Sequence, residues 1–356
     1  GSTVIYPEVT VYEKSVSAPN GRSVFQFSAV PDEIYPAAQG FKDGVILLDN
    51  SWKASDLNYA ADYVGNTANK AREVSNSNPV LLNAEIFATK MGKKYVETGG
   101  CGPGYSAADV YTAFYYFDYP IRSGIKKTTS TIERNYSTTD PAKYTEVTST
   151  FHYDNLNNNH QQLSRKITLD SEGNSIKTQY WYPADYGAID NIPALISKNI
   201  INKPIKEETH RNTLLVAGKI TRLNADGEVL EVYEHESTVP QTAPLHNSNT
   251  LIPAGYVKKV DVGYDASTKN LNRLQALDNV NTAYLWAYNN SYPVAKAVNA
   301  LAADVAATSF ESDGKGNWSY NGSTYNDAAA KTGAYYYKLG GANISKSLTP
   351  RKYKLE

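Results

Sequence analysis

Apolar and polar side chains alternate over residues 145–153, and this period of two predicts a half-buried β-strand. An Asn-rich turn follows, and two further strands are predicted over about 163–169 and 176–182, with a polar turn between them. Three consecutive strands joined by short polar loops predict an antiparallel meander.

The same pattern recurs in the second half of the chain. Residues 214–223 and 228–236 flank an Asp226-Gly227 pair, which is a strong hairpin signal. A further strand is predicted over 257–264, and another hairpin over 284–288 and 292–297. Helix signals are few: a short helix is predicted over 189–197, and the Ala-rich segment 296–308 fits either a helix or a linker. The pattern therefore predicts a mostly β protein of antiparallel stacked hairpins, an open or partly curled sheet with a few short helices.

Composition and charge exclude several classes of protein. The chain has 35 Lys and Arg against 36 Asp and Glu, a net charge of −1, which argues against a nucleic-acid binder or a polybasic membrane binder. No apolar run reaches the roughly 18 residues of a membrane helix, so membrane insertion is not expected. Cys101 is the single cysteine, which excludes a disulfide framework and any zinc site with two thiolates. No cofactor or metal is expected.

A short motif occurs twice. Tyr153-Asp154 and Tyr264-Asp265 are each followed by a leucine at the same spacing, Leu163 and Leu274, and then by an aromatic strand. This favours an internal repeat of hairpin units.

These motifs resemble a known family. The two Tyr-Asp hairpins resemble segments of large secreted or surface proteins of Bacteroidetes that are similar to the Rhs, or YD-repeat, family, over roughly residues 1–300. The same resemblance extends to residues 49–53 (DNSWK), 119–124 (YPIRSG), 284–288 (YLWAY) and 292–296 (YPVAK). It implies an extended sheet of stacked hairpins, which in Rhs proteins curls into a hollow shell around a cargo, often a toxin. Longer turns here, and no recognisable self-cleavage segment, favour an open sheet.

The C-terminal part differs from the rest. Phe310-Glu311, Trp318 and residues 332–339 resemble the opening strands of a carbohydrate-binding jelly-roll module, or alternatively complete the preceding sheet. The expected division is 1–125 as an N-terminal β-rich region, 126–300 as YD-like hairpins, and 301–356 as a linker with jelly-roll-like strands.

Exposed aromatic side chains are the sharper candidates for a binding site. Trp181 shares its strand parity with Lys177 and Gln179, which predicts a position on the polar face of the sheet. Large rings on a solvent face stack on sugars or on partner proteins, but packing against a neighbouring loop or layer is the favoured alternative. The candidate ligand-binding residues are Tyr180, Trp181, Tyr182, Trp286 and Trp318.

Catalytic signals are weak. Cys101 lies in a Gly-rich segment, 99–104, where a reactive thiol or an incidental one would both fit. Glu207 and Glu208 are adjacent in a predicted strand and should point to opposite faces, so they cannot act together across one glycosidic bond.

The sequence thus leads us to expect a non-enzymatic structural or binding segment of a larger Rhs-like polypeptide, secreted or displayed on the cell surface. Its expected partners are other parts of the same polypeptide and a glycan or protein surface. Gly1-Ser2 and Leu355-Glu356 are typical of cloning remnants, so a leader is expected to have been removed. The alternatives are a carbohydrate-binding surface module and an enzyme whose site is assembled from distant residues.

Overall fold

The computed structural model describes most of the chain, namely residues 6–14, 20–35, 46–65, 67–93, 114–156, 160–170, 172–237, 239, 241–242, 246–276, 280–328, 330–340 and 343–350. Cys101 and its Gly-rich segment lie outside these ranges.

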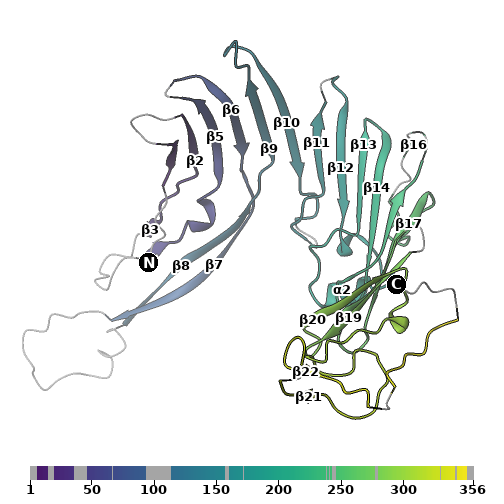
Figure 1. The fold of residues 1–356 in the computed structure, drawn as a ribbon. Helices are drawn as coiled ribbons and strands as arrows, with labels where there is room; N and C mark the ends of the chain where they lie inside the picture. Colours follow the sequence, from purple (N-terminus) through teal and green to yellow (C-terminus); the bar gives the residue numbers. More distant parts are fainter. Residues whose placement is uncertain are drawn as a thin grey trace, which may run out of the picture. The chain divides into compact units, whose positions relative to one another are not determined.

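The described structure is mostly β (Figure 1). In the first half the strands are β1 (Glu8–Glu13), β2 (Gly21–Phe27), β3 (Glu33–Tyr35), β4 (Ile46–Leu48), β5 (Leu57–Val64), β6 (Lys70–Ser77), β7 (Val80–Lys93), β8 (Phe114–Lys126), β9 (Ser130–Tyr136), β10 (Tyr144–His152), β11 (Arg165–Leu169) and β12 (Ser175–Trp181). In the second half they are β13 (Lys206–Arg211), β14 (Leu214–Leu223), β15 (Val229–His235), β16 (Gln241–Thr242), β17 (Tyr256–Tyr264), β18 (Leu271–Gln275), β19 (Asn281–Ala287), β20 (Tyr292–Val298), β21 (Tyr325–Asn326) and β22 (Tyr335–Tyr336). The helical elements are α2 (Ile192–Ser197) and three single 3₁₀ turns, η1 (Ser51–Lys53), η2 (Pro183–Asp185) and η3 (Ala302–Asp304).

One large antiparallel sheet dominates, and it is not closed. Its strand order is β1-β2-β5-β6-β9-β10-β11-β12-β13-β14-β15-β17-β18-β19-β20, with β16 paired to β14. The order follows the chain, with β3–β4 and β7–β8 inserted as separate two-stranded ladders. The predicted fold class is confirmed.

The chain divides into two compact units, Gly1–Lys177 and Thr178–Glu356. The boundary falls inside β12, and neither of the expected boundaries, near residues 125 and 300, coincides with it.

The predicted strands are confirmed in both units, with small shifts at their ends. Residues 145–153 correspond to β10, which pairs antiparallel with β9 and β11. The Asn224–Gly227 turn is closed by two backbone hydrogen bonds, from Gly227 N to Asn224 O at 3.0 Å and from Asn224 N to Glu228 O at 2.8 Å. The predicted 284–297 hairpin is β19–β20.

Helix α2 begins at Ile192, three residues later than predicted, with Pro193 in its first turn, where a missing N–H removes no helical hydrogen bond. The segment 296–308 forms no α-helix: β20 continues to Val298, and the single 3₁₀ turn η3 follows. Its alanines permit a helix, but cross-strand hydrogen bonding to β19 holds its first residues extended.

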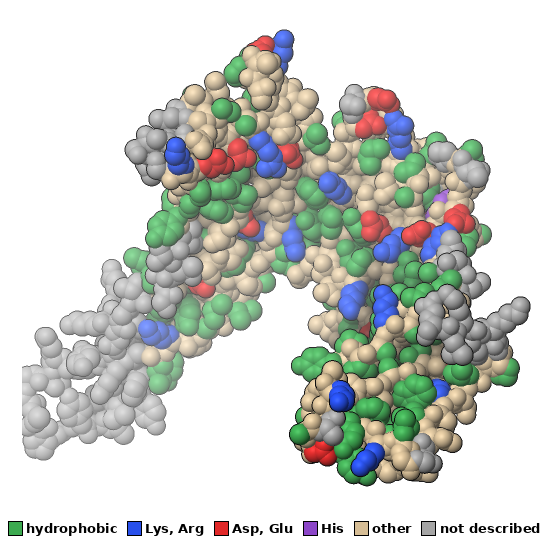
Figure 2. Space-filling model, viewed as in Figure 1, with side chains coloured by type: hydrophobic (Ala, Val, Ile, Leu, Met, Phe, Trp, Pro, Cys, Tyr) green, Lys and Arg blue, Asp and Glu red, His purple; other side chains and the backbone are tan. Residues whose placement is uncertain are grey.

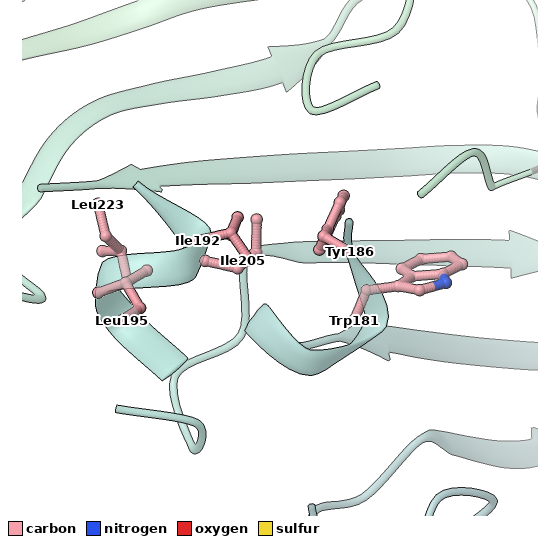
Figure 3. Packing of buried hydrophobic residues seen from close by; sticks show 6 residues of the cluster. All are labelled: Trp181, Tyr186, Ile192, Leu195, Ile205 and Leu223. Carbon is pink, nitrogen blue, oxygen red and sulfur yellow. The ribbon is translucent and has the colours of Figure 1, made fainter. Parts of the chain in front are cut away.

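The core of unit 2 lies where α2 and η2 cover the sheet. Trp181, Tyr186, Ile192, Leu195, Ile205 and Leu223 pack together and are each at most 8% exposed (Figure 3). Ile192 and Leu195 come from the same face of α2, so the short helix is held by this packing rather than by its own length.

The C-terminal part of unit 2 has little sheet. Its described residues form one two-residue pair, β21–β22, and an isolated bridge between Ser319 and Ser345. In the segment 332–339 the structure therefore has only Tyr335–Tyr336 as strand, in its own two-stranded sheet rather than joined to the preceding one. Stacked rings of Phe310 and Tyr337, 5.9 Å apart, pack instead against Tyr320.

Candidate functional site

Trp181 does not lie on an exposed polar face, and that expectation is wrong. The residue is 8% exposed and belongs to the unit 2 core. Its ring stacks on His246 with centroids 5.3 Å apart, and the Lys206 ammonium lies 4.6 Å from the ring centroid. The segment that carries His246 covers this end of β12, so the parity that Trp181 shares with Lys177 and Gln179 does not make its surroundings polar.

The other candidate aromatic residues are buried or half-buried, and two of them form hydrogen bonds within the chain. Tyr182 is 6% exposed, and its N–H donates to the Asp185 carboxylate at 2.8 Å as the chain enters η2. Trp286 is half-buried, and its indole N–H donates to the Leu271 carbonyl at 2.7 Å. Tyr180 and Trp318 are half-buried. Only Tyr180, Trp181 and Tyr182 are neighbours in the chain, and the first two occupy opposite faces of β12.

A row of buried ionisable side chains on β13 is the most unusual feature beside Trp181. Lys206, Glu208 and His210 alternate along the strand and are 3%, 2% and 5% exposed. The Lys206 Nζ lies 2.6 Å from Glu208 Oε1, and His210 Nε2 lies 3.4 Å from Glu208 Oε2. Buried charges are strongly disfavoured unless they are paired, so this arrangement needs each partner in place.

Tyr256 completes the row from β17. Its hydroxyl donates to Glu208 Oε1 at 2.7 Å, and its ring reaches across β14 at Gly218, where an added Cβ would collide with the hydroxyl. Gly218 is the residue paired with Glu208 in the ladder, so the missing side chain is what admits the tyrosine. We call Lys206, Glu208, His210 and Tyr256 the β13 cluster.

Burial controls the chemistry of the tyrosines in and near the β13 cluster. Burial, followed by the hydrogen bond to Glu208 and its negative charge, raises the pKa of Tyr256. Burial, followed by the charges of Asp185 and Glu208, raises the pKa of Tyr186. Both phenols are therefore neutral over the physiological range, and Tyr256 acts as a hydrogen-bond donor.

The β13 cluster could be partly anticipated from sequence. The opposite orientation of Glu207 and Glu208 is confirmed, since Glu207 is half-buried and Glu208 is buried. The same parity places Lys206, Glu208 and His210 on one face. The sequence does not indicate which face of β13 is buried, because the residues of the other face, Glu207, Thr209 and Arg211, are polar too.

A second buried carboxylate, in unit 1, is held in a similar way. Glu73 on β6 is 5% exposed and accepts hydrogen bonds from Tyr59 at 3.0 Å, Tyr136 at 2.7 Å and Arg134 at 3.0 Å, and it is ion-paired with Lys70. Burial opposes its ionisation, but these hydrogen bonds outweigh burial and lower the pKa of Glu73 to about 2. We call Glu73 and its four partners the Glu73 cluster.

A shallow depression lies between α2 and β14. Its polar wall is occupied by an ion pair between Arg222 and Asp190, 2.7 Å apart. Arg222 also pairs with Glu231 at 2.9 Å, so the polar groups of this depression are already engaged.

The described part of the chain shows neither a metal-binding cluster nor a membrane-spanning helix. No group of three or more His, Cys, Asp or Glu side chains with metal-binding geometry occurs among the described residues. No helix in the described ranges is long and apolar enough to cross a membrane.

The described arrangement can join strands, neutralise buried charge and fix side-chain positions. Comparison with known proteins finds no family model and no curated protein that matches the chain. The resemblance to Rhs-like proteins therefore stays a prediction.

Proposed function

We propose that this chain is a non-enzymatic structural and binding segment of a larger secreted or surface polypeptide of the Rhs-like kind. Its work is architectural: sequential hairpins build one open antiparallel sheet, and side-chain clusters lock neighbouring strands together. Its partners are other parts of the same polypeptide and a protein or glycan surface.

The observation that carries this proposal is that the buried ionisable side chains of the β13 cluster and the Glu73 cluster form their hydrogen bonds and ion pairs with other side chains of the same sheet. In the β13 cluster, Lys206 and Tyr256 both engage the same Glu208 oxygen. In the Glu73 cluster, one carboxylate joins residues from β5, β6 and β9. Such clusters add cross-strand cohesion where hydrophobic burial is limited.

The enzymatic alternative needs reactive groups that a substrate can reach. His210 and Glu208 form the acid and imidazole pair of the β13 cluster, but they are 5% and 2% exposed. A general base must come within hydrogen-bond reach of the proton that it removes, and these groups face the protein interior. The geometry supports a role in stability for this pair.

The carbohydrate-binding alternative is less well supported. A sugar platform needs a ring face open to solvent, whereas Trp181 is 8% exposed and its ring contacts His246 and Lys206.

An immunoblot of fractionated producing cells tests the proposal. We expect an antibody against this chain to detect a species larger than 39.1 kDa in the surface or secreted fraction. Protease treatment of intact cells should remove this species, while a cytoplasmic marker is the control. Detection of the chain only in the cytoplasmic fraction, as a species of about 39.1 kDa, would contradict the proposal.

A further inference from the structure

Two tyrosines close the β9–β10 hairpin in unit 1. Tyr136, the last residue of β9, lies directly opposite Tyr144, the first residue of β10. The next pair outward carries a ladder hydrogen bond, from Ser137 N to Lys143 O at 2.9 Å, so the tyrosines form a non-hydrogen-bonded pair, the kind whose side chains are closest. Their ring centroids are 5.5 Å apart and the ring planes are tilted by 55°, which is the range of aromatic contact.

The Tyr136 hydroxyl has a proton acceptor. It donates to Glu73 Oε1 at 2.7 Å. Burial, followed by the hydrogen bond to Glu73, raises the pKa of Tyr136, so the phenol keeps its proton at neutral pH, whereas the pKa of Glu73 is about 2 and its carboxylate is ionised. A neutral phenol that loses an electron becomes a strong acid and must release its proton. The Glu73 carboxylate is in position to accept that proton.

Tyr144 is the member of the pair that an oxidant can reach, since it is 49% exposed. The Arg134 guanidinium lies 5.1 Å from its ring centroid, and the charge of Arg134 is balanced by ion pairs with Glu146 at 2.7 Å and with Glu73 at 3.0 Å. These contacts hold the Tyr144 ring against Tyr136.

The same arrangement recurs in unit 2. Tyr325 and Tyr336 lie opposite each other in the β21–β22 ladder, with ring centroids 5.6 Å apart. The Tyr336 hydroxyl donates to the Asp327 carboxylate at 3.1 Å, and Tyr325 is 49% exposed. The Lys338 Nζ lies 5.9 Å from the Tyr325 ring centroid. Figure 2 shows hydrophobic side chains, a class that includes tyrosine, beside basic ones at the surface of this C-terminal part.

Two further tyrosine pairs lack part of this arrangement. Tyr288 and Tyr292 are 6.1 Å apart and are 43% and 65% exposed, but neither hydroxyl has a carboxylate partner among the described residues. Tyr320 and Tyr337 are closer, at 4.6 Å, but Tyr320 is 6% exposed and the Tyr337 hydroxyl donates to a backbone carbonyl. These pairs separate the effect of a carboxylate from the effects of proximity and exposure.

We propose that Tyr136 and Tyr144 form an oxidative crosslinking site, at which a peroxidase with hydrogen peroxide joins the two rings by a carbon–carbon bond. Tyr325 and Tyr336 form a second site of the same kind. The first bond joins β9 to β10 covalently, in a chain whose single cysteine permits no internal disulfide.

The reaction balances as an oxidation that removes two hydrogens. Each phenol gives one electron to the oxidant and releases its hydroxyl proton, to Glu73 from Tyr136 and to water from the exposed Tyr144. The two phenoxyl radicals couple at the ring carbons adjacent to the carbons that bear oxygen, and the hydrogens on these two carbons move to the oxygens and restore both hydroxyls. The two electrons and two protons released reduce one hydrogen peroxide to two waters.

Peroxidase treatment of the purified whole chain, with limiting hydrogen peroxide, followed by tryptic digestion and mass spectrometry, tests this. Trypsin places Tyr136 and Tyr144 on separate peptides, 135–143 and 144–165, and Tyr325 and Tyr336 on 316–331 and 332–338. We expect each pair of peptides to be recovered as one species, lighter than its two parts by two hydrogens and with dityrosine fluorescence. Peptide 274–296, which carries both Tyr288 and Tyr292, should keep its mass.

Variants test the role of the carboxylate. Glu73→Gln keeps an acceptor for the Tyr136 hydroxyl but removes the base, so it should slow the first crosslink by about tenfold or more. Glu146→Gln is the matched control, because Glu146 also pairs with Arg134 but does not contact the Tyr136 hydroxyl, and it should not slow the reaction. Tyr144→Phe should abolish the first crosslink and leave the second unchanged.

Circular dichroism shows whether each variant is folded. Asp327→Asn, at an exposed residue, makes the same test on the second pair if Glu73→Gln does not fold. A digest without the Tyr136–Tyr144 crosslink overturns the proposal. Equal or faster loss of hydrogen from peptide 274–296 overturns it as well, because proximity and exposure alone would then decide the reaction. Undiminished crosslinking in folded Glu73→Gln or in Asp327→Asn would also contradict it.

Discussion

Replacement of Glu208 by glutamine tests whether the β13 cluster stabilises the fold. The Gln side chain keeps the shape and one acceptor for Tyr256, but it removes the charge 2.6 Å from the Lys206 ammonium. Both side chains are at most 3% exposed, so the ammonium cannot regain its lost partner from water without local opening. Removing one member of a buried ion pair costs about 3–5 kcal/mol. We expect Glu208→Gln to lower the free energy of unfolding by this amount.

The assay is equilibrium urea unfolding followed by circular dichroism, with hydrogen exchange of the β13 and β14 amides to locate the loss in unit 2. Glu207→Gln is the matched control, because Glu207 is the adjacent half-buried carboxylate on the opposite face; it should change stability by less than about 0.5 kcal/mol.

A double variant tests whether the loss of stability in Glu208→Gln comes from leaving the Lys206 ammonium buried without a charged partner. Lys206→Met with Glu208→Leu removes both charges and should recover much of the loss, because paired apolar replacements of a buried ion pair are often neutral or stabilising. If Glu208→Gln costs less than about 1 kcal/mol, the pair behaves as a surface salt bridge and the reasoning fails.

Three further predictions follow from single contacts. The pKa of Glu73 is about 2, below its ordinary value of 4.5, so its contribution to stability is full above about pH 4.5 and is lost as pH falls toward 2. Glu73→Gln should therefore flatten the loss of stability between about pH 5 and 2, measured by urea unfolding across pH; parallel wild-type and variant curves would contradict this. Gly218→Ala should destabilise the chain by about 1–3 kcal/mol because the new Cβ displaces the Tyr256 hydroxyl, whereas Gly340→Ala, which adds a Cβ in open space, should not; equal effects in thermal unfolding would refute the close approach. Trp181→Ala should lower stability by about 3–5 kcal/mol in urea unfolding, and a glycan array on which only this variant loses binding while unfolding normally would restore the sugar-platform hypothesis.

Much of the fold could be predicted from local patterns. The strand 214–223 and the turn at Asp226-Gly227 were predicted with their observed boundaries, because alternation and turn chemistry act over a few residues. The extended course of residues 296–298 was not decided locally, since alanine permits both helix and strand and the ladder with β19 determines the outcome.

The candidate site was harder to predict. The sequence shows which residues share a face of a strand, but a face is buried only if another segment covers it. Trp181 is covered by His246 and Lys206, which are distant in sequence, so its parity with polar neighbours gave the wrong environment. Tyr256 joins Glu208 only because β14 and β17 bring Gly218 and the tyrosine to the same place.

By itself, the sequence determined a mostly β chain, its hairpins and which side chains lie on opposite sides of each strand, because these follow from backbone geometry with a period of two. Tertiary structure decided which side of each strand is buried and which charged groups meet. Those outcomes depend on long-range pairing and on desolvation, and both are properties of groups that the chain brings together only when it folds.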